Sequence, residues 1–494
     1  MSIAYHESTK TFHLTNGQIS YIMKVLPNGA LGQLYFGKAI RDRESFDHLL
    51  EMKHRPMSSW VFEGNKLFSL EHTRQEYPSY GSTDYRHPAV QILQPNGSQI
   101  TDFVVQSHSV TPGKPPLEGL PATYCESGSE AETLTVRLRD ELLGVSLDLN
   151  YTLFADRPAL ARSARLVNEG DLDLHLTHAM SLCLDLPDRD YEFVHFSGAW
   201  SRERWMKVRH LEQGIQSVES ARGNSSHNHN PFVMLRRPGT DEDQGEVIGL
   251  SLVYSGNFLA QAEVDTWDTT RVTLGINPFG FDWKLAPGES FQTPEAVMVY
   301  SHEGMNAMSR TFHQLYRSRL ARGRWRDKPR PILINNWEAT YFDFTEDKLV
   351  TIAEAAHKDG VELFVLDDGW FGARCSDFAG LGDWTPNRDR LPEGLASLAR
   401  RINGLGMQFG LWFEPEMVNK DSDLYRAHPD WIIHVPGRRE SHGRNQYVLD
   451  FSRPEVVDCI YDQMAKLLSG ANISYVKWDM NRSISEPFSE ALPP

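Results

Sequence analysis

Polar and aromatic residues follow four short apolar segments in the last third of the chain. At the ends of these segments stand, in chain order, Asn335-Asn336-Trp337-Glu338, Asp367-Asp368-Gly369-Trp370, Trp412-Phe413-Glu414-Pro415-Glu416 and Lys477-Trp478-Asp479-Met480-Asn481-Arg482. Carboxylates accept hydrogen bonds from sugar hydroxyls, and an indole ring covers the apolar C–H face of a pyranose. The composition of these segment ends therefore favours a carbohydrate-binding pocket.

Lys477 and Asp479 stand two positions apart at the end of the fourth segment. In a β-strand that spacing places both side chains on one face. A lysine ammonium beside the aspartate would favour its ionised form, which is the form that a glycosidase nucleophile requires. From this motif alone, a purely structural Lys–Asp ion pair at a strand end is the competing interpretation.

The adjacent carboxylates Asp367 and Asp368 admit three interpretations: a helix N-cap, a set of metal ligands, or a clamp for two sugar hydroxyls. Metal binding is the weakest of these, because no histidine lies nearby in the sequence to complete a site. His227 and His229 occupy a polar loop and lack a third ligand, so a plain loop is expected there. We therefore predict neither a metal nor a cofactor.

Alternating apolar strands and amphipathic helices carry these segments. Strands are predicted at 331–334, 361–366, 407–413 and 473–478, and helices at 346–358, 391–405 and 454–468. Repeated βα units form a parallel sheet, and barrels of this kind have their active sites at the carboxyl ends of the strands. Residues 331–494 are thus predicted to be the first half of a catalytic (β/α)₈ barrel.

The first 302 residues show the period-two alternation of half-buried strands. Val145, Leu147, Leu149 and Tyr151 alternate with polar neighbours, and the pattern recurs at 134–138, 172–176 and 250–252. These features predict an antiparallel sandwich over 1–302, with Trp200 and Trp205 in its core. A helical linker is expected at 303–330, so the fold class is multidomain β + α/β.

Composition narrows the classes of partner. The chain has 494 residues and a formal net charge of −16, which argues against nucleic acid or anionic membrane as partners. The N-terminal residues lack the basic and apolar regions of a secretion signal, and no apolar run reaches the roughly 18 residues of a membrane span. The four cysteines are widely scattered, so a cytoplasmic location with free thiols is expected.

Several ordered motifs resemble those of glycoside hydrolase family 36, the bacterial α-galactosidases that act on melibiose and raffinose. In the second half the matching segments are 336–343, 366–372, 381–384, 410–417, 428–431, 448–454 and 477–482. In the first half they are Glu76-Tyr77-Pro78, Asp84-Tyr85-Arg86, Trp200-Ser201-Arg202-Glu203-Arg204 and Arg222-Gly223-Asn224-Ser225-Ser226-His227. The resemblance spans essentially the whole chain.

The resemblance implies a retaining α-galactosidase that hydrolyses terminal α-D-galactosyl residues through a covalent galactosyl intermediate on Asp479. The first domain would be the β-supersandwich of the family, and the complete protein a homo-oligomer, since the family forms tetramers. The residues that would hold the galactose hydroxyls are Asp367, Asp368, Arg444, Lys477 and Asn481. Those that would line the pocket are Trp337 and Trp412.

The general acid/base of the family lies on a later barrel strand, so it is expected beyond residue 494. A retaining enzyme needs that second carboxyl about 5–5.5 Å from the nucleophile. Glu486 and Glu490 follow Asp479 only in a loop-like tail, so this chain alone is expected to be catalytically impaired.

Two alternative functions are a non-catalytic galactoside-binding remnant and a transglycosylase of the raffinose-synthase kind. The presence of Asp479 disfavours the binding remnant, which would not need a nucleophile.

Overall fold

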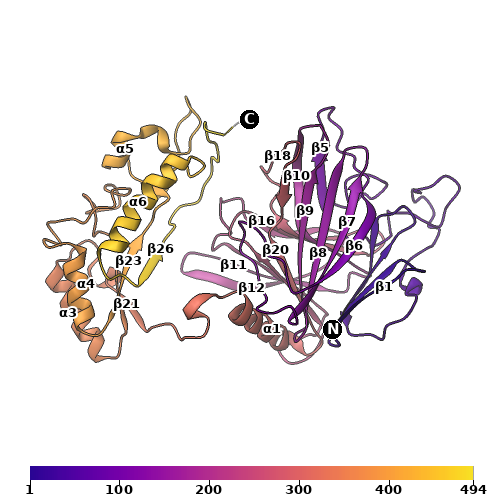
Figure 1. The fold of residues 1–494 in the computed structure, drawn as a ribbon, viewed down its shortest axis with the longest axis horizontal. Helices are drawn as coiled ribbons and strands as arrows, with labels where there is room; N and C mark the ends of the chain where they lie inside the picture. The colour runs from indigo at the N-terminus through magenta and orange to yellow at the C-terminus, as the bar shows by residue number, and fades with distance from the viewer. Residues whose placement is uncertain (493–494) are drawn as a thin grey trace. The chain divides into compact units, whose positions relative to one another are not determined.

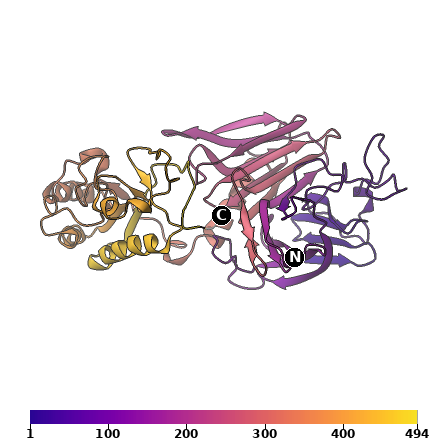
Figure 2. The same cartoon turned by 90° about the horizontal axis from the view of Figure 1, so that it is seen from above.

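A computed structural model describes residues 1–492, which fall into two compact units divided after Arg326 (Figures 1 and 2). The first unit consists of antiparallel sheets and the second of βα repeats. Both classes agree with the sequence prediction. No helix within residues 1–492 combines the length and the apolar content needed to cross a bilayer.

Three antiparallel sheets build the first unit. The ten-stranded sheet has the order β12 (Arg202–His210), β11 (Glu192–Ala199), β14 (His229–Arg236), β15 (Val247–Val253), β20 (Glu295–Ser301), β9 (Ala159–Asn168), β8 (Val145–Phe154), β7 (Ala131–Asp140) and β6 (Val104–Pro112), with β19 (Ser290–Gln292) beside β9. The six-stranded sheet contains β13 (Gly214–Glu219), β16 (Phe258–Val264), β17 (Thr270–Ile276), β10 (Leu174–Leu186), β18 (Trp283–Leu285) and β5 (Val90–Leu93). The four-stranded sheet is β1 (Ser2–His6), β2 (Thr11–Thr15), β3 (Ile19–Val25) and β4 (Leu31–Lys38).

The strand β8 is buried on both faces, although the sequence predicted one wet face. Leu147 and Leu149 join the main apolar core, as expected. Their polar neighbours are buried too: Asp148 receives a bidentate pair of hydrogen bonds from Arg137 of β7, both 2.7 Å long. Cross-strand pairing with Arg137, which is itself exposed, therefore satisfies the carboxylate of Asp148.

The hairpin of β11 and β12 corrects a second expectation. Trp200 and Trp205 were predicted to lie in the core, but 83% and 63% of their surfaces are exposed. The reason is topological, because β12 is the edge strand of the ten-stranded sheet and all nine of its residues are exposed. A hydrophobicity pattern does not tell an edge strand from an interior one.

Helix α1 (Gly304–Arg319) packs against the first unit. Its Met308 and Phe312 share an apolar cluster with Val297 and Val299 of β20. Gly249 of β15 allows this close approach, since a Cβ there would stand 2.6 Å from the Met308 sulfur. The segment predicted as a linker thus begins with a helix that belongs to the sandwich.

The second unit is built on a parallel sheet of four strands in the order β21 (Leu333–Asn335), β22 (Leu363–Leu366), β23 (Gln408–Phe413) and β26 (Tyr475–Trp478). The other elements are α2 (Trp337–Thr340), α3 (Glu346–Lys358), α4 (Leu395–Gly404), α5 (Asp423–Ala427), α6 (Pro454–Gly470) and the hairpin of β24 (Met417–Val418) and β25 (Tyr447–Val448). Helix α4 begins four residues later than predicted, because Pro392 and Gly394, whose φ is 79°, precede it. Four parallel strands form part of a (β/α)₈ barrel, as the sequence predicted.

Candidate active site

The register of the parallel sheet brings the carboxyl ends of its strands to one edge. Leu366 pairs with Leu411, and Trp412 pairs with Lys477. The backbone N–H of Asp479 donates to the carbonyl of Phe413 (2.8 Å), which extends the ladder by one residue. Residues that follow β22, β23 and β26 are consequently neighbours, although Asp367 and Asp479 lie far apart in the sequence.

Asp367 lies at the centre of this edge and is buried. Its Oδ2 accepts a hydrogen bond from the ammonium of Lys477 (2.7 Å), and its Oδ1 accepts from the backbone N–H of Asp368 (2.9 Å). Its own N–H donates to Oδ1 of the buried Asn336 (2.9 Å), which ties the end of β21 to that of β22. A hydrogen-bonded ion pair of this kind fixes both side chains in place.

Asp368 faces a different partner. The guanidinium of Arg374, which is 1% exposed, donates from Nε to Oδ1 (2.9 Å) and from Nη2 to Oδ2 (2.7 Å) of Asp368. A further nitrogen of Arg374 donates to Oδ1 of Asn419 (3.1 Å). Burial raises the pKa of Asp368 above its usual value, while Arg374 acts in the opposite direction.

Asp479 is held by neutral donors. Its Oδ2 accepts from the indole Nε1 of Trp412 (3.0 Å) and from Nδ2 of Asn481 (2.8 Å), and its Oδ1 accepts from the N–H of Met480 (3.0 Å). The expected partnership with Lys477 is wrong, because that ammonium donates to Asp367 instead. Hydrogen bonds to the charged form stabilise a carboxylate without a cation.

Glu414 is a site residue that the sequence reasoning did not single out. It is fully buried, and its two oxygens accept from the N–H of Asn481 (2.5 Å) and from Nε2 of Gln446 (2.9 Å). Burial raises its pKa. Because Asn481 in turn donates to Asp479, Glu414 positions the loop that carries Asp479. The one feature of the sequence that could have identified Glu414 is its position directly after β23, at the carboxyl end of a parallel strand.

The two remaining sequence candidates lie at the periphery of this group. Trp337 is half-buried and packs edge-on against Tyr341 and Phe342, with ring centroids 5.2 and 5.1 Å away. Arg444 has a positive φ of 51° and a half-exposed side chain 3.8 Å from Asp377. Within residues 1–492, no hydrogen bond joins Arg444 to Asp367 or Asp479.

The edge as a whole presents one carboxylate with neutral donors, one carboxylate paired with a lysine and one paired with an arginine. Such a set can bind several hydroxyl groups and supply a nucleophilic oxygen. Within residues 1–492, no group of three histidine, cysteine, aspartate or glutamate side chains could hold a metal ion.

Sequence comparisons identify related proteins. The family model described as "Glycosyl hydrolase family 36 N-terminal domain" matches residues 29–286, and "Melibiase" matches residues 290–494. The α-galactosidase AgaA of Geobacillus stearothermophilus is 54% identical over 100% of this chain, which covers 68% of that protein. The α-galactosidase Mel36A of Lactobacillus acidophilus is 43% identical, with 99% of this chain and 67% of that protein covered.

Solved structures agree with these matches. The family 36 α-galactosidase AgaB of Geobacillus stearothermophilus has a TM-score of 0.97 at 54% identity and covers 100% of this chain, which spans 68% of AgaB. The α-galactosidase of Lactobacillus brevis has a TM-score of 0.98 at 45% identity, with 99% and 66% of the two chains covered. A substituted AgaA in complex with raffinose has a TM-score of 0.96 at 53% identity, with 98% and 67% covered.

Proposed function

This chain belongs to glycoside hydrolase family 36, and we propose that it works as a retaining α-galactosidase with Asp479 as its nucleophile. The observation that carries this proposal is the carboxylate of Asp479, hydrogen-bonded by Trp412 and Asn481 at the strand edge that also holds the ion pair of the buried Asp367 with Lys477. The indole and amide donors restrict the rotation of the carboxylate without placing a cation beside it.

In the proposed reaction an oxygen of Asp479 attacks the anomeric carbon of the galactoside. A C–O bond to Asp479 forms while the C–O bond to the leaving group breaks, and the departing oxygen takes a proton from a general acid. Water then hydrolyses the galactosyl ester, with the same acid group now acting as the base. Two inversions at the anomeric carbon give net retention.

We propose that the galactosyl hydroxyls bind the charged groups around Asp479. The free lone pairs of the Asp367 and Asp368 carboxylates would accept from hydroxyls, whereas Lys477 would donate to them. Arg444 and Asn481 would complete the polar set, and Trp337 and Trp412 would cover the apolar face of the ring. The raffinose and stachyose complexes of substituted AgaA support α-galactosides of this kind as substrates.

The proton donor is proposed to lie outside residues 1–494. Glu414 is enclosed by Asn481 and Gln446, and Asp367 is paired with Lys477, so neither carboxyl is free to protonate a leaving group. Glu486 is bound by the hydroxyls of Ser441 and Ser485 on an exposed segment. The chain also covers only 68% of the length of AgaA.

Comparison of two substrates tests this function. We expect this chain to cleave nitrophenyl α-galactoside much faster than raffinose, because nitrophenolate leaves without protonation whereas a sugar alkoxide does not. Addition of the remaining C-terminal third of AgaA as a separate polypeptide is expected to raise the raffinose rate if the pieces associate. Initial rates are measured by nitrophenolate absorbance and by released galactose.

Three outcomes would count against the proposal. Equal rates on both substrates would place the acid within this chain. Binding of raffinose without any turnover of either substrate would favour a galactoside-binding remnant. Transfer of galactose to added sucrose in preference to water would favour a transglycosylase.

We further propose that the protein forms a homo-oligomer and is cytoplasmic. The exposure of Trp200 and Trp205 supports an oligomer, because exposed aromatic residues are enriched at protein interfaces. Light scattering is expected to give a multiple of the 56.3 kDa chain mass and a lower mass for the Trp200→Ser/Trp205→Ser variant. Tyr461→Ser, which removes a 68% exposed aromatic ring from α6, is the matched control. An unchanged mass in the double variant would exclude this hairpin as the interface.

A further inference from the structure

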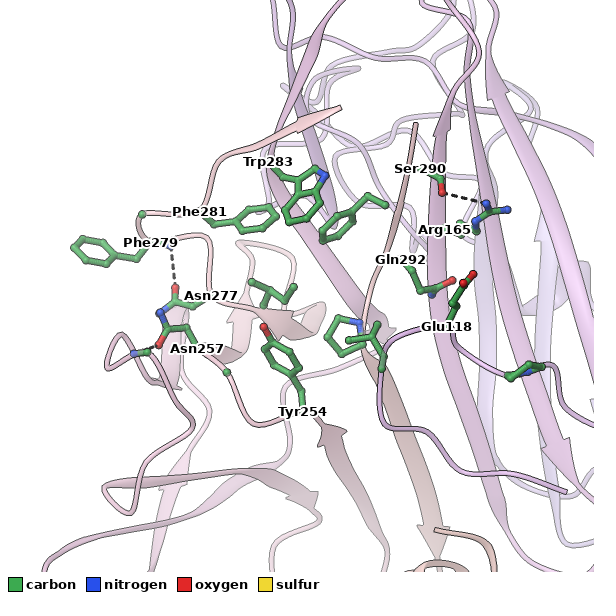
Figure 3. A pocket seen from close by; sticks show the side chains of 18 residues that line it. Glu118, Arg165, Tyr254, Asn257, Asn277, Phe279, Phe281, Trp283, Ser290 and Gln292 are labelled. Atoms are coloured by element: carbon green, nitrogen blue, oxygen red, sulfur yellow. Dashed lines mark hydrogen bonds between the residues drawn. The ribbon is translucent and has the colours of Figure 1, made fainter. Parts of the chain in front are cut away.

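A cavity of about 870 Å³ opens on the first unit (Figure 3). Its wall comes from the connection between β17 and β18, from the segment that follows β15, from β9 and β19, and from a loop near residue 118. All of these belong to the first unit, whereas Asp479 belongs to the second, so the cavity shares no residue with the candidate active site. Ligand sites in proteins are commonly about 300–1,000 Å³, so the volume suits an oligosaccharide.

Aromatic rings line one side of the cavity (Figure 3). Phe291 is buried and anchors two rings, that of Trp283 at 5.2 Å and that of Phe281 at 5.7 Å between centroids. Trp283 remains 48% exposed and Phe279 76% exposed. Large exposed rings beside a cavity offer flat apolar surfaces to a ligand.

The loop that carries these rings is rigidly attached. Asn277 is 2% exposed; its Oδ1 accepts from the N–H of Phe279 (3.0 Å) and its Nδ2 donates to the carbonyl of Ser220 (3.0 Å). Gly256 makes room for the ring of Tyr254, since a Cβ at that position would lie 2.5 Å from the ring. The cavity is therefore formed before any ligand arrives, which lowers the entropic cost of binding.

Polar groups stand on the opposite side (Figure 3). The guanidinium of Arg165 donates to Oγ of Ser290 (3.1 Å), which leaves further N–H groups of Arg165 to donate to a ligand. The Nε2 of Gln292 donates to two backbone carbonyls, so its Oε1 remains available to accept a hydrogen bond from a ligand. Glu118 adds one exposed carboxylate. One cation and one anion favour a ligand without net charge.

We propose that this cavity is a second, non-catalytic site that binds a neutral oligosaccharide. A sugar ring has apolar C–H faces that pack on Trp283 and Phe279, and hydroxyls that exchange hydrogen bonds with Arg165, Gln292 and Glu118. An apolar lipid chain is disfavoured, because it would bury the charges of Arg165 and Glu118. A polyanion is disfavoured, because the carboxylate of Glu118 would repel it. The proposal does not depend on the role of Asp479.

Stachyose binding to the whole chain provides the test. Calorimetric titration is carried out on the Asp479→Asn chain, which cannot consume the sugar, in the presence of saturating 1-deoxygalactonojirimycin to occupy the catalytic edge. We expect stachyose to bind the inhibitor-saturated Asp479→Asn chain. Addition of Trp283→Ala is expected to weaken this binding by about tenfold or more, because an aromatic contact with the sugar is lost. Gly256→Ala is expected to weaken it through displacement of the Tyr254 ring.

Two controls separate binding in this cavity from binding elsewhere on the chain. Trp283→Ala in the otherwise unaltered chain is expected to leave the rate on nitrophenyl α-galactoside unchanged, and Trp205→Ala to leave stachyose binding unchanged. Absence of inhibitor-resistant stachyose binding, or binding that is equally tight in Trp283→Ala, would overturn the proposal. So would a change of oligomeric mass in Trp283→Ala without any stachyose binding, since the cavity would then be a contact between copies of the chain. If the chain showed no α-galactosidase activity, these titrations would still test the cavity, because they measure binding and not turnover.

Discussion

Asp479→Asn lowers the rate on nitrophenyl α-galactoside by on the order of 10⁴-fold or more, because an amide cannot form the galactosyl ester. The substitution keeps an oxygen that accepts from Trp412 or Asn481, so the fold of the strand edge is expected to persist. Initial rates at saturating substrate measure the effect, and thermal unfolding confirms that both proteins are folded. Asp430→Asn is the matched control, since Asp430 is an exposed carboxylate of the same unit paired with Arg453.

A rescue experiment separates a nucleophile from a merely structural carboxylate. In Asp479→Gly, azide is expected to enter the space of the lost carboxylate and attack the anomeric carbon. The new C–N bond replaces the C–O bond to nitrophenolate, so the product is a galactosyl azide of inverted, β configuration. Residual activity above roughly a tenth of the original in Asp479→Asn, or no azide adduct in Asp479→Gly, would contradict the assignment.

The sequence predicted which residues stand at the strand ends, because that depends only on local pattern and strand direction. Asp367, Asp368, Trp412 and Asp479 each follow or end an apolar run, and parallel pairing brings those ends together. The antiparallel sandwich was predictable for the same reason, since period-two alternation is a local signal.

Pairing between side chains was not predictable, because it depends on strand order. Lys477 on β26 reaches Asp367 after β22, and β23 lies between these two strands in the sheet. Sequence proximity instead suggested Asp479 as its partner. Glu414 was missed for a similar reason. It accepts a hydrogen bond from the N–H of Asn481, and the loop that carries Asn481 follows the neighbouring strand β26.

Removal of the buried guanidinium in Arg374→Met is expected to destabilise the chain by about 3–5 kcal/mol at pH 7, the usual result of leaving a buried charge unpaired. Asp368 is 6% exposed and loses its hydrogen bonds from Arg374. Chemical denaturation measures the free energy of unfolding. Arg388→Met, at an arginine of the same unit that donates to the carbonyl of Pro392 on the surface, is expected to change it by less than about 1 kcal/mol.

The deficit is expected to depend on pH. Burial already raises the pKa of Asp368 in the folded chain, and loss of Arg374 removes the group that opposes this rise. The folded variant then keeps a proton that the unfolded chain releases above its pKa of about 3.9. The destabilisation therefore grows as pH rises from that value through the folded pKa and shrinks as pH falls below it. A deficit that is constant from acidic to neutral pH would show that unpaired charge is not its cause.

The double variant Asp368→Asn/Arg374→Met tests whether the unpaired charge of Asp368 causes the deficit, because it removes that charge. Asparagine has nearly the shape of aspartate but no charge to bury, so it should recover part of the stability lost in Arg374→Met and abolish the pH dependence. Galactoside binding should remain poor in both variants, because Arg374→Met removes the hydrogen bonds that hold the Asp368 carboxylate and the double variant replaces that carboxylate. Recovery of stability together with loss of the pH dependence would show that the unpaired charge of Asp368 causes the deficit in Arg374→Met.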